Sequence, residues 1–564
     1  MNVAVSHAAP LNCATRLRAV LIVFVAAASA IAPASFIGLP VGPDFNFHIP
    51  LWLDVARQWQ QGVWFPRWAH LAEYGFGQPA CTFYPPLSWM LGAALVSVLP
   101  LNAAPAIFVL IVLLIAGLCM FALALRILPA RAAMTAAVWY AVNPFHLLTA
   151  YQLGAFAELF ASALFPLVVL GVLRLEHHWR TGVTLALGIA AIWLTNFPAA
   201  VIASYAAALM ILVAALRLRS GRIFVNGAIA LGLGLALAAF IVLPAAYERR
   251  WVNIYEALIP DLSPESNFLF GWDYDPDAGW FPVVLSTVAL CEIGLIAIAA
   301  VLSRKWSRRN PPWWPIVVIA AAGAVFLMFP ITGPLWRHLP ELPYVQFPWR
   351  ALFIVNCSLA VLIAAMFAGS SVHASRLVLP VLLVAGGVGA GWTAKWAHGA
   401  VTQIAQSVSA EGYGGRPEYM PQGSHYQLIW QWVFKMPKVA EANSAGQPLN
   451  DQESQLRVSV QEWGPEQKAI DISSPHRTRI MLRLLNYPIW KVMLNGAQIS
   501  PLTQPETGQI IVPVPQGHSK VEVRYRRTWD RTAGSIISLA ACLLLMEMAC
   551  NSAQSKTLRG RSGA

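Results

Sequence analysis

Charged residues are scarce in this chain. Only 11% of its 564 residues are Asp, Glu, Lys or Arg, whereas a soluble protein of this size carries roughly 25%. Hydrophobic residues make up 57%, and the mean hydropathy is +0.57. Because charge is costly in hydrocarbon, and backbone polar groups there must be satisfied within helices, this composition excludes an ordinary soluble domain and predicts a polytopic membrane protein.

Cysteine is sparse as well, and its positions do not indicate a cross-linked fold. The seven cysteines lack metal-ligand spacing, and the polar stretch 394–532 has none, so we expect neither a disulfide framework nor a zinc site there. The net charge of +12 lies mostly in short loops between apolar runs, where it sets membrane orientation rather than indicating a nucleic-acid partner.

Long apolar runs dominate the rest of the sequence. With the N-terminus in the cytoplasm, twelve spans place every cluster of basic loop residues inside, as expected for a multi-pass protein of the bacterial inner membrane. The first run follows Arg16 and Arg18, and we interpret it as a retained span rather than a cleaved signal peptide. The predicted spans are 19–38, 105–125, 132–146, 155–173, 181–196, 198–216, 224–244, 281–302, 313–330, 351–369, 377–393 and 533–550.

A further apolar piece, 87–99, is short and follows Pro85-Pro86. Counting it as a thirteenth span would invert everything after it, so we interpret it as a re-entrant or interfacial helix. Residues 394–532 alternate between apolar and polar positions, for example at Ile480, Leu482 and Leu484, and contain turn signals, which predicts a small β domain.

The predicted organisation therefore has three parts. They are a transmembrane domain over 1–393 with external loops 39–104, 245–280 and 331–350, an external β-rich domain over 394–532, and a final transmembrane helix with a basic cytoplasmic tail over 533–564.

The stretch VGPDFNFHIPLWLDVARQWQQGVWFPRWA, residues 41–69, places polar groups directly after the first apolar run. Asp44 is a candidate general base, and the alternative is a turn or helix-cap aspartate. Residues 50–61 are patterned as an interfacial helix with Pro50 in its first turn. Because of that proline we do not expect a continuous helix from Asp44, and His48 is either a partner of Asp44 or a packing residue.

A second acidic stretch, FGWDYDPDAGW over 270–280, has alternating aspartates. Asp273, Asp275 and Asp277 supply three carboxylates at a spacing that could bind a divalent cation, although the glycine and distal glutamate of a calcium loop are missing. A solvated acidic loop is the alternative, so a divalent metal stays possible and no cofactor is certain.

Several motifs in residues 42–91 occur together. Asp44 and His48 are followed by G-x-x-x-P-R-W from Gly62, by G-x-G-x-P from Gly75 and by Y-P-P-L from Tyr84. This pattern resembles the first external loop of a bacterial membrane family with the GT-C glycosyltransferase architecture, described as 6-pyruvoyl-tetrahydropterin-synthase-related membrane proteins.

Later segments are similar to the same family. They are YQLGAFAELFASALFPL with Glu158, LPAAYERRWV with Glu248 and LPYVQFPWRAL with Arg350, while NYPIWKVMLNG resembles the β domain of a related family that glycosylates cell-wall polymers. The resemblance implies a GT-C-like all-α membrane domain of about 12–13 transmembrane helices, with a small external β domain before the last helix. The chain departs from the family pattern at Leu153, where an arginine is usual, and near Asn196, where a histidine is usual.

The resemblance also implies an activity: inverting transfer of a sugar from a polyprenyl-phosphate donor to an extracytoplasmic glycan or lipid acceptor. In that reaction Asp44, with His48 and Glu158, would be catalytic. Arg350, Arg249 and His338 would bind the donor phosphate, where charge develops. The alternatives are a helix-dipole role for Glu158 and an interfacial anchor role for Arg350.

Two other functions fit the sequence. Proline-interrupted spans are a feature of transporters, so a flippase of lipid-linked saccharide is one alternative, although no inverted repeat is visible. A catalytically silent member of the same fold is the other, and Leu153 supports it.

Overall fold

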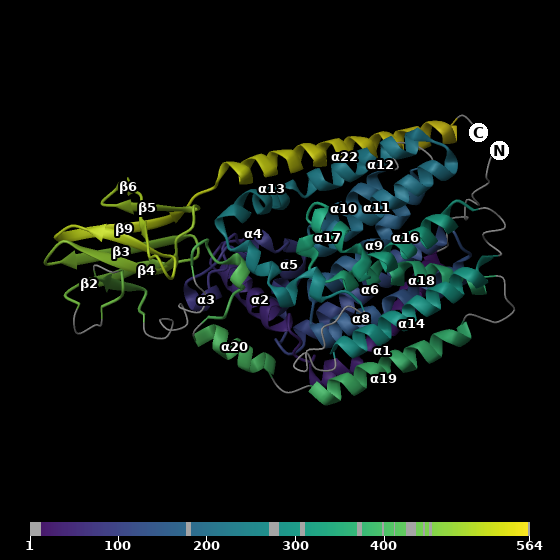
Figure 1. The fold of residues 1–564 in the computed structure, drawn as a ribbon, viewed down its shortest axis with the longest axis horizontal. Helices are drawn as coiled ribbons and strands as arrows, with labels where there is room; N and C mark the ends of the chain where they lie inside the picture. The colour runs from purple at the N-terminus through teal and green to yellow at the C-terminus, as the bar shows by residue number, and fades with distance from the viewer. Residues whose placement is uncertain are drawn as a thin grey trace.

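The computed structural model describes residues 13–175, 182–269, 281–304, 311–368, 375–396, 400–410, 412–424, 436–443, 446–449 and 454–561. These residues form a long bundle of helices with β-sheets at one end, and the last helix runs from the sheets along the whole bundle (Figure 1). The predicted combination of a helical membrane part and a small β part before the final helix is confirmed.

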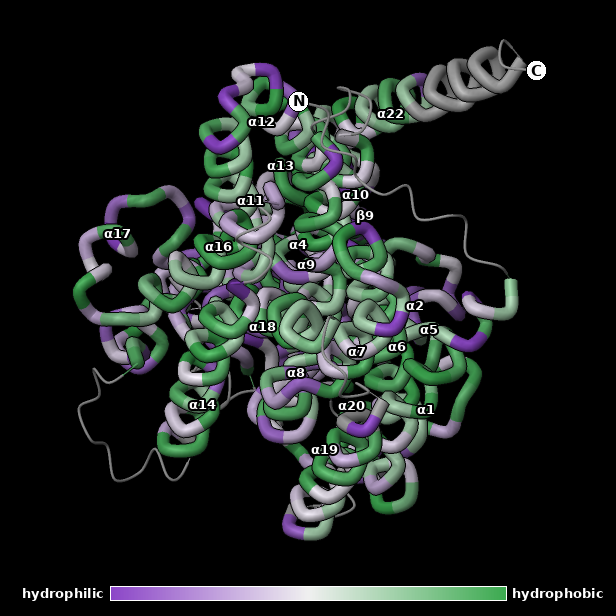
Figure 2. Tube along the Cα trace, turned by 90° about the vertical axis from the view of Figure 1, so that its right-hand side faces the viewer, coloured by the Kyte–Doolittle hydropathy of each residue, from purple (hydrophilic) through white to green (hydrophobic). Residues whose placement is uncertain are grey.

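Seven helices among the described residues are long and apolar enough to cross a membrane. They are α1 (Cys13–Ile37), α6 (Ala104–Leu125), α9 (Phe156–Arg174), α11 (Phe197–Leu218), α14 (Phe281–Leu302), α18 (Leu352–Phe367) and α22 (Trp529–Arg561). In Figure 2, α9 and α18 lie inside a surround of mostly hydrophobic helices, and their residues are almost all buried. The chain is therefore a multi-pass membrane protein.

Two further apolar segments are bent rather than straight. Helix α12 (Gly221–Leu237) meets the segment that begins with α13 (Ala239–Glu248) at 74°, and α16 (Trp313–Leu327) meets the segment with α17 (Gly333–His338) at 89°. In each pair, the two segments are long and apolar enough to cross a membrane only when they are taken together. Each pair is therefore either one broken span or a re-entrant loop.

The remaining predicted spans coincide with α7 (Ala130–Ala141), α10 (Val183–Trp193) and α19 (Ser375–Trp396). Helix α7 is followed by the short α8 (Pro144–Leu148). Helix α5 (Pro86–Val98) has 13 residues and is about 20 Å long, too short for a hydrocarbon core of about 30 Å. Helices α7 and α10 are shorter still, with 12 and 11 residues, so length does not distinguish α5 from a span, and the total of twelve or thirteen spans stays a prediction.

The first loop departs from the sequence-based expectation. Helix α2 spans Phe45–Gln60 without a break and contains Pro50 in its interior, so the predicted helix start at residue 50 is wrong. A proline inside a helix removes a hydrogen bond, but Phe45, Ile49 and Trp52 are completely buried here, and their packing outweighs that loss. Two short helices follow, α3 (Ala72–Gly75) and α4 (Ala80–Phe83).

The polar side of α2 also differs from that of an interfacial helix, because Asp54 and Gln58 are buried. The Asp54 carboxylate accepts hydrogen bonds from the Leu71 backbone N–H at 2.9 Å and from Gln58 Nε2 at 3.0 Å. The first of these bonds ties α2 to the loop that leads into α3, and the second lies within α2. A short helix within the predicted β-rich stretch, α20 (Ala400–Ala410), packs against α2.

The β part consists of two antiparallel sheets, with strand orders β1-β4-β8-β7 and β2-β3-β9-β5-β6. Inward-facing apolar residues such as Ile472, Leu482 and Val523 belong to one shared core. By contrast, β2 is exposed at every residue except the last, Trp463, which is partly buried and packs against that core. The strands are β1 (Val439–Ala442), β2 (Arg457–Trp463), β3 (Gln467–Ser474), β4 (Thr478–Leu485), β5 (Trp490–Leu494), β6 (Ala497–Ile499), β7 (Leu502–Thr503), β8 (Gln509–Val514) and β9 (Gly517–Tyr525).

A buried ion pair joins α22 to α13, and its guanidinium also contacts the last strand of the sheets. Arg531, in the first turn of α22, donates from Nε and Nη2 to the two carboxylate oxygens of Glu248 at 2.7 and 2.8 Å. The same guanidinium donates to the Tyr525 hydroxyl at 2.8 Å and to Thr82 Oγ1 at 3.0 Å. These contacts hold the β part over α4 and the first loop.

Candidate functional site

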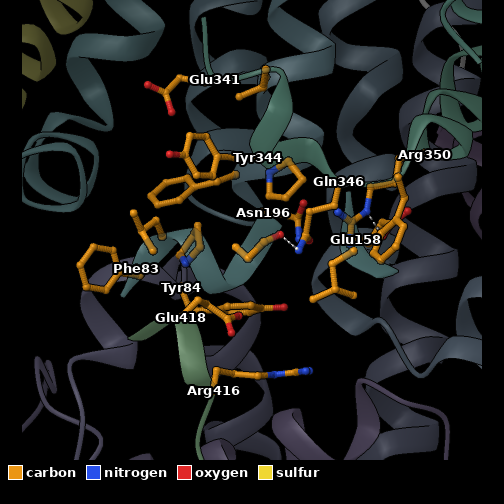
Figure 3. Close-up of a pocket in the computed structure, with 18 of the residues that line it drawn as sticks. Phe83, Tyr84, Glu158, Asn196, Glu341, Tyr344, Gln346, Arg350, Arg416 and Glu418 are labelled. Atoms are coloured by element: carbon orange, nitrogen blue, oxygen red, sulfur yellow. Dashed lines mark hydrogen bonds and ion pairs between the residues drawn. The ribbon is translucent and has the colours of Figure 1, made fainter. Parts of the chain in front are cut away.

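One cavity of about 800 Å³ is lined by residues from the first loop, from the starts of α9 and α11 and from the segment 416–419 that precedes the strands. Four of the predicted site residues line it: Asp44, Glu158, Arg249 and Arg350. Figure 3 shows Glu158 and Arg350 together on one side of this cavity and Arg416 on another. The rest of the wall is largely aromatic and aliphatic, with Phe47, Phe197, Phe347 and Trp349 among the lining residues.

Asp44 occupies the N-cap position of α2, but its side chain makes no capping hydrogen bond. Instead, Oδ1 forms an ion pair with Arg416 Nη2 at 2.9 Å, and both side chains are about one-third exposed. The backbone N–H of Asp44 donates to the Leu153 carbonyl at 3.1 Å. A Cβ on Gly42 would overlap that carbonyl, so a glycine is needed for this close approach. The alternative role of a capping aspartate is therefore absent, and the carboxylate faces the cavity.

His48 lies one helical turn after Asp44, with its backbone N–H donating to the Asp44 carbonyl at 3.0 Å. Its ring is completely buried behind the cavity wall and is not among the lining residues. Nε2 lies 3.3 Å from the Tyr84 hydroxyl, which does belong to the wall. Burial lowers the pKa of His48 to about 4, against the raising effect of Asp44. His48 is thus a neutral group that reaches the cavity only through Tyr84.

Glu158 and Arg350 form a buried ion pair, with Arg350 Nε donating to Glu158 Oε2 at 2.9 Å. Glu158 lies in the first turn of α9, as the sequence predicts. Arg350 Nη1 donates to the Val345 carbonyl at 2.6 Å, and the guanidinium lies 4.7 Å from the centre of the Phe347 ring. The Arg350 side chain is only 10% exposed and the Glu158 side chain only 3%. Arg350 is therefore an internal brace as well as a lining residue.

The turn braced by Arg350 is strained. Gln346 has φ 67 and ψ −53, and the Phe347 N–H donates to the Val345 carbonyl at 2.7 Å across it. This is a γ-turn with positive φ, which is rare for a non-glycine residue and costs on the order of 1–3 kcal/mol. Such strain persists only where surrounding contacts hold it, and here Arg350 is one of them.

The other two predicted phosphate ligands, Arg249 and His338, differ in their position relative to the cavity. Arg249 pairs with Glu341 at 2.8 Å, and both side chains are nearly half exposed; both residues line the cavity. His338, at the end of α17, is exposed and does not line it. The structure therefore brings four of the six predicted site residues to one cavity, leaves His48 behind its wall and leaves His338 outside.

Arg416, Glu418 and Tyr419 also line the cavity, and the sequence reasoning missed them. They belong to GYGGRPEYMPQG, which was assigned to the β domain without a role. The available signal was a run rich in glycine, proline and charge that lacks strand alternation. Arg416 lies 372 residues after its partner Asp44, and no local pattern predicts such a contact.

The segment that carries Arg416 is held by the first loop. Gln78 clamps the Arg416 backbone from both sides, accepting from the N–H at 3.0 Å and donating to the carbonyl at 3.1 Å. Two further backbone bonds connect Tyr413 with Leu71 and Tyr74, at 3.1 and 3.0 Å. The position of Arg416 is therefore set by the residues around the G-x-G-x-P motif.

The two positions that depart from the family pattern both line the cavity. Asn196 caps α11, its Oδ1 accepting from the Ala199 N–H at 2.9 Å. Leu153 supplies the carbonyl that holds Asp44. Asn196 therefore has a local structural role, and the Leu153 side chain leaves the nearby wall apolar.

No group of three His, Cys, Asp or Glu side chains suited to a metal occurs in the part of the chain that the structure describes. The alternating aspartates Asp273, Asp275 and Asp277 lie outside the described residues.

Comparison with known proteins gives weak similarities. No family profile and no curated protein matches the chain. Among solved structures it is similar to ArnT from Cupriavidus metallidurans bound to undecaprenyl phosphate, with 14% identity, a TM-score of 0.40, and coverage of 65% of this chain and 62% of that one. It is also similar to the Archaeoglobus fulgidus oligosaccharyltransferase in complex with Zn and sulfate, with 16% identity, a TM-score of 0.37 and coverage of 70% and 53%.

A structure of the same oligosaccharyltransferase tethered with an acceptor peptide gives 14% identity, a TM-score of 0.39 and coverage of 71% and 56%. The match thus spans less than two thirds of each of these proteins. Similarity at this level assigns neither an activity nor a ligand to this chain. The resemblance to the 6-pyruvoyl-tetrahydropterin-synthase-related membrane family rests on the sequence motifs alone.

Proposed function

We propose that this chain is a membrane glycosyltransferase that moves a sugar from a polyprenyl-phosphate donor to an extracytoplasmic glycan or lipid acceptor. One observation carries the proposal: the Asp44 carboxylate lines the same cavity as the Glu158–Arg350 pair, beside membrane helices. Binding sites are concave, mostly apolar and equipped with a few convergent polar groups, and this cavity has those properties.

The proposed reaction has one bond-making and one bond-breaking event. The acceptor hydroxyl oxygen attacks the anomeric carbon of the sugar, and the bond from that carbon to the phosphate oxygen breaks with its electron pair going to the phosphate. The hydroxyl proton passes to the Asp44 carboxylate, which acts as general base. Arginine guanidinium groups along the cavity stabilise the negative charge that grows on the departing polyprenyl phosphate.

The wall composition suits a lipid-linked donor. Its aromatic side chains, such as Phe197, Phe347 and Trp349, offer faces against which a sugar ring packs. Leu235 and Val242, from α12 and α13, provide apolar surface on the helix side of the same cavity. A ligand with a polar head and a hydrocarbon tail matches both kinds of wall.

The cavity would open on the outer side of the membrane. Helix α11 begins at the cavity and ends at Leu218, next to the basic loop residues Arg217, Arg219 and Arg222. Basic loops favour the cytoplasmic side, so the opposite end of α11, with the cavity, is proposed to be extracytoplasmic.

Loss of transfer in Asp44→Asn tests this function. The full chain, purified into nanodiscs, is mixed with polyprenyl-phosphate-linked hexoses and pentoses and with cell-envelope acceptors, and release of polyprenyl phosphate is measured by mass spectrometry. We expect a loss of about 10²–10⁴-fold, because this is what a general base contributes. Asp471→Asn, on β3 and outside the cavity lining, is the matched control.

The alternatives give different results. Movement of lipid-linked saccharide across a proteoliposome membrane without a glycosylated product would favour a flippase. An absence of both turnover and movement would favour a catalytically silent protein. Full activity of a folded Asp44→Asn variant would refute the proposed function.

A further inference from the structure

We infer that the Asp44–Arg416 ion pair is exchangeable: a phosphate group in the cavity replaces the Asp44 carboxylate on Arg416, and this frees Asp44 to accept a proton. The inference rests on the proposed function, since it concerns the phosphate of the donor. It assigns to Arg416 the phosphate contact that the sequence assigns to Arg350.

The two cavity arginines differ in how fully their guanidinium groups are used. Arg350 is tied to Glu158, to the Val345 carbonyl and to the Phe347 ring, and its side chain is only 10% exposed. Arg416 is 34% exposed, and within the described residues its guanidinium makes one hydrogen bond, to Asp44. A ligand can therefore engage Arg416 without dismantling a buried network, whereas Arg350 would have to give up its bracing contacts.

Phosphate is a stronger partner for this guanidinium than the carboxylate is. The donor's phosphodiester carries one negative charge, as the carboxylate does, but the planar fork of arginine matches its oxygens with two parallel hydrogen bonds, whereas Asp44 accepts only one. The negative charge on the phosphate grows as its bond to the sugar breaks, which strengthens the contact with Arg416 further. The competing pair is partly exposed, and exposed pairs are held weakly because water screens and solvates both charges. Exchange therefore favours the phosphate.

Arg416 is also positioned to remain in place when Asp44 leaves. Gln78 holds its backbone on both sides, and its guanidinium lies 5.0 Å from the centre of the Phe47 ring. In contrast, only the backbone of Asp44 is held in place, by its hydrogen bond to the Leu153 carbonyl. The carboxylate can therefore move away from Arg416 by rotation of the Asp44 side chain, without movement of the backbone.

Four acidic residues besides Asp44 line the cavity, of which Glu341 is paired with Arg249 and Glu256 is exposed to solvent. Glu158 is neutralised by Arg350. Glu418, two residues from Arg416, also lines the cavity, and burial raises the pKa of its carboxyl above the ordinary value although Arg416 opposes this effect. A carboxyl with a raised pKa carries less negative charge toward an incoming phosphate and, when protonated, donates a hydrogen bond to it.

The exchange couples donor binding to chemistry. As long as Asp44 is paired with Arg416, its Oδ1 is held by the guanidinium and is not available to an acceptor hydroxyl. When phosphate takes Arg416, the carboxylate becomes a free base beside the sugar.

The inference is tested by measuring how tightly undecaprenyl phosphate binds to two variants, one expected to bind it more weakly than the wild type and one expected to bind it more tightly. The full chain is placed in phosphatidylcholine nanodiscs, and the Kd is measured for undecaprenyl phosphate and, in a separate arm, for inorganic phosphate. We expect Arg416→Gln to weaken binding about tenfold or more, as the loss of a charge-assisted hydrogen bond does. Asp44→Asn should tighten binding about threefold or more, because it removes the competing carboxylate.

The matched control is Arg524→Gln on β9. Arg524 pairs with Glu522 at 2.7 Å, is 55% exposed and does not line the cavity, so its substitution should leave the Kd unchanged. If the two variants change the Kd in the expected directions for both undecaprenyl phosphate and inorganic phosphate, the phosphate group alone is the ligand. If the Kd changes in these directions for undecaprenyl phosphate only, the lipid tail is also required. Either result supports the exchange.

An unchanged Kd in a folded Arg416→Gln variant, or weaker binding in Asp44→Asn, overturns the inference. If Arg416→Gln does not fold, the sign of the Asp44→Asn effect decides by itself. The proposed function can fail separately. If both variants change the Kd in the expected directions while Asp44→Asn still transfers sugar, the exchange is supported and the assignment of Asp44 as the base is wrong. If Asp44→Asn abolishes transfer while Arg416→Gln binds normally, the function stands and the exchange falls.

Discussion

Individual polar residues acquire specific roles in a chain with so little charge. Glu73 is completely buried between the first loop and the segment with Arg416, with Oε1 accepting from Gln78 Nε2 at 3.2 Å. Its Oε2 has no hydrogen-bond partner among the described residues. A Cβ on Gly415 would overlap the ends of the Glu73 and Gln78 side chains, so a larger residue there would displace these groups from the segment. Glu73 therefore belongs to the support of Arg416 rather than to the cavity.

Glu73 should make stability depend on pH. Burial raises its pKa to about 8 from an ordinary value of 4.5. Between these two values the unfolded chain releases a proton that the folded chain keeps, so the free energy of unfolding falls as pH rises, by at most about 1.4 kcal/mol per pH unit. We expect the melting temperature of Glu73→Gln to fall less than that of the wild type between pH 5 and pH 7.5.

Thermal unfolding in nanodiscs at the two pH values measures this difference. Glu265→Gln, which changes an exposed glutamate, should follow the wild type. Equal pH dependence of Glu73→Gln and the wild type would show that Glu73 does not carry the effect.

A second residue-scale prediction concerns Arg350. Because its guanidinium braces the strained Gln346 turn through Nη1 and meets Glu158 through Nε, a lysine cannot replace it, since one ammonium cannot reproduce the planar fork. Arg350→Lys should lower the melting temperature and the transfer rate together. A variant that kept its stability and lost only phosphate affinity would instead make Arg350 a direct ligand.

At the scale of elements, a buried ion pair in the first turn of α22 adds to the packing of this helix against α12 and α13. Arg531 and Glu248 are 1% and 0% exposed and are bound through two hydrogen bonds. Removing one member of such a pair leaves a buried charge, at a cost of about 3–5 kcal/mol, whereas replacing both with apolar residues costs much less.

A double-mutant cycle tests this attachment. Arg531→Leu and Glu248→Leu should each destabilise the protein strongly, and the double variant should be more stable than the sum of the two effects predicts. The free energy of unfolding in denaturant is the measurement. Additive effects would show that the two residues stabilise α22 independently.

At the scale of the whole molecule, the cavity and the basic loop after α11 lie at opposite ends of that helix. In a variant without its native cysteines, Trp64→Cys in the first loop should react with a membrane-impermeant maleimide in intact cells. Arg222→Cys should react only after permeabilisation. Both positions are exposed, so burial would not explain a difference, and the reverse pattern would place Asp44 in the cytoplasm.

Local patterns predicted much of this molecule. Apolar runs indicated the helices, strand alternation indicated the β part, and the motifs selected Asp44, Glu158 and Arg350, which line one cavity. The continuous α2 was not predicted, because the burial of Phe45 and Ile49 that offsets the cost of Pro50 is a property of the packed molecule. The separation of His338 from the cavity was missed for a similar reason: two residues in one predicted loop can face different surroundings.

The sequence by itself determined that the protein is a multi-pass membrane protein with a small β part, because hydrophobic length and periodicity are local properties that can be read residue by residue. Only the tertiary structure decided that Arg416 pairs with Asp44 and that Arg350 braces a turn. The first contact joins residues that are 372 positions apart, and the second exists only in the folded turn, so both depend on how the helices pack and which loops that packing brings together.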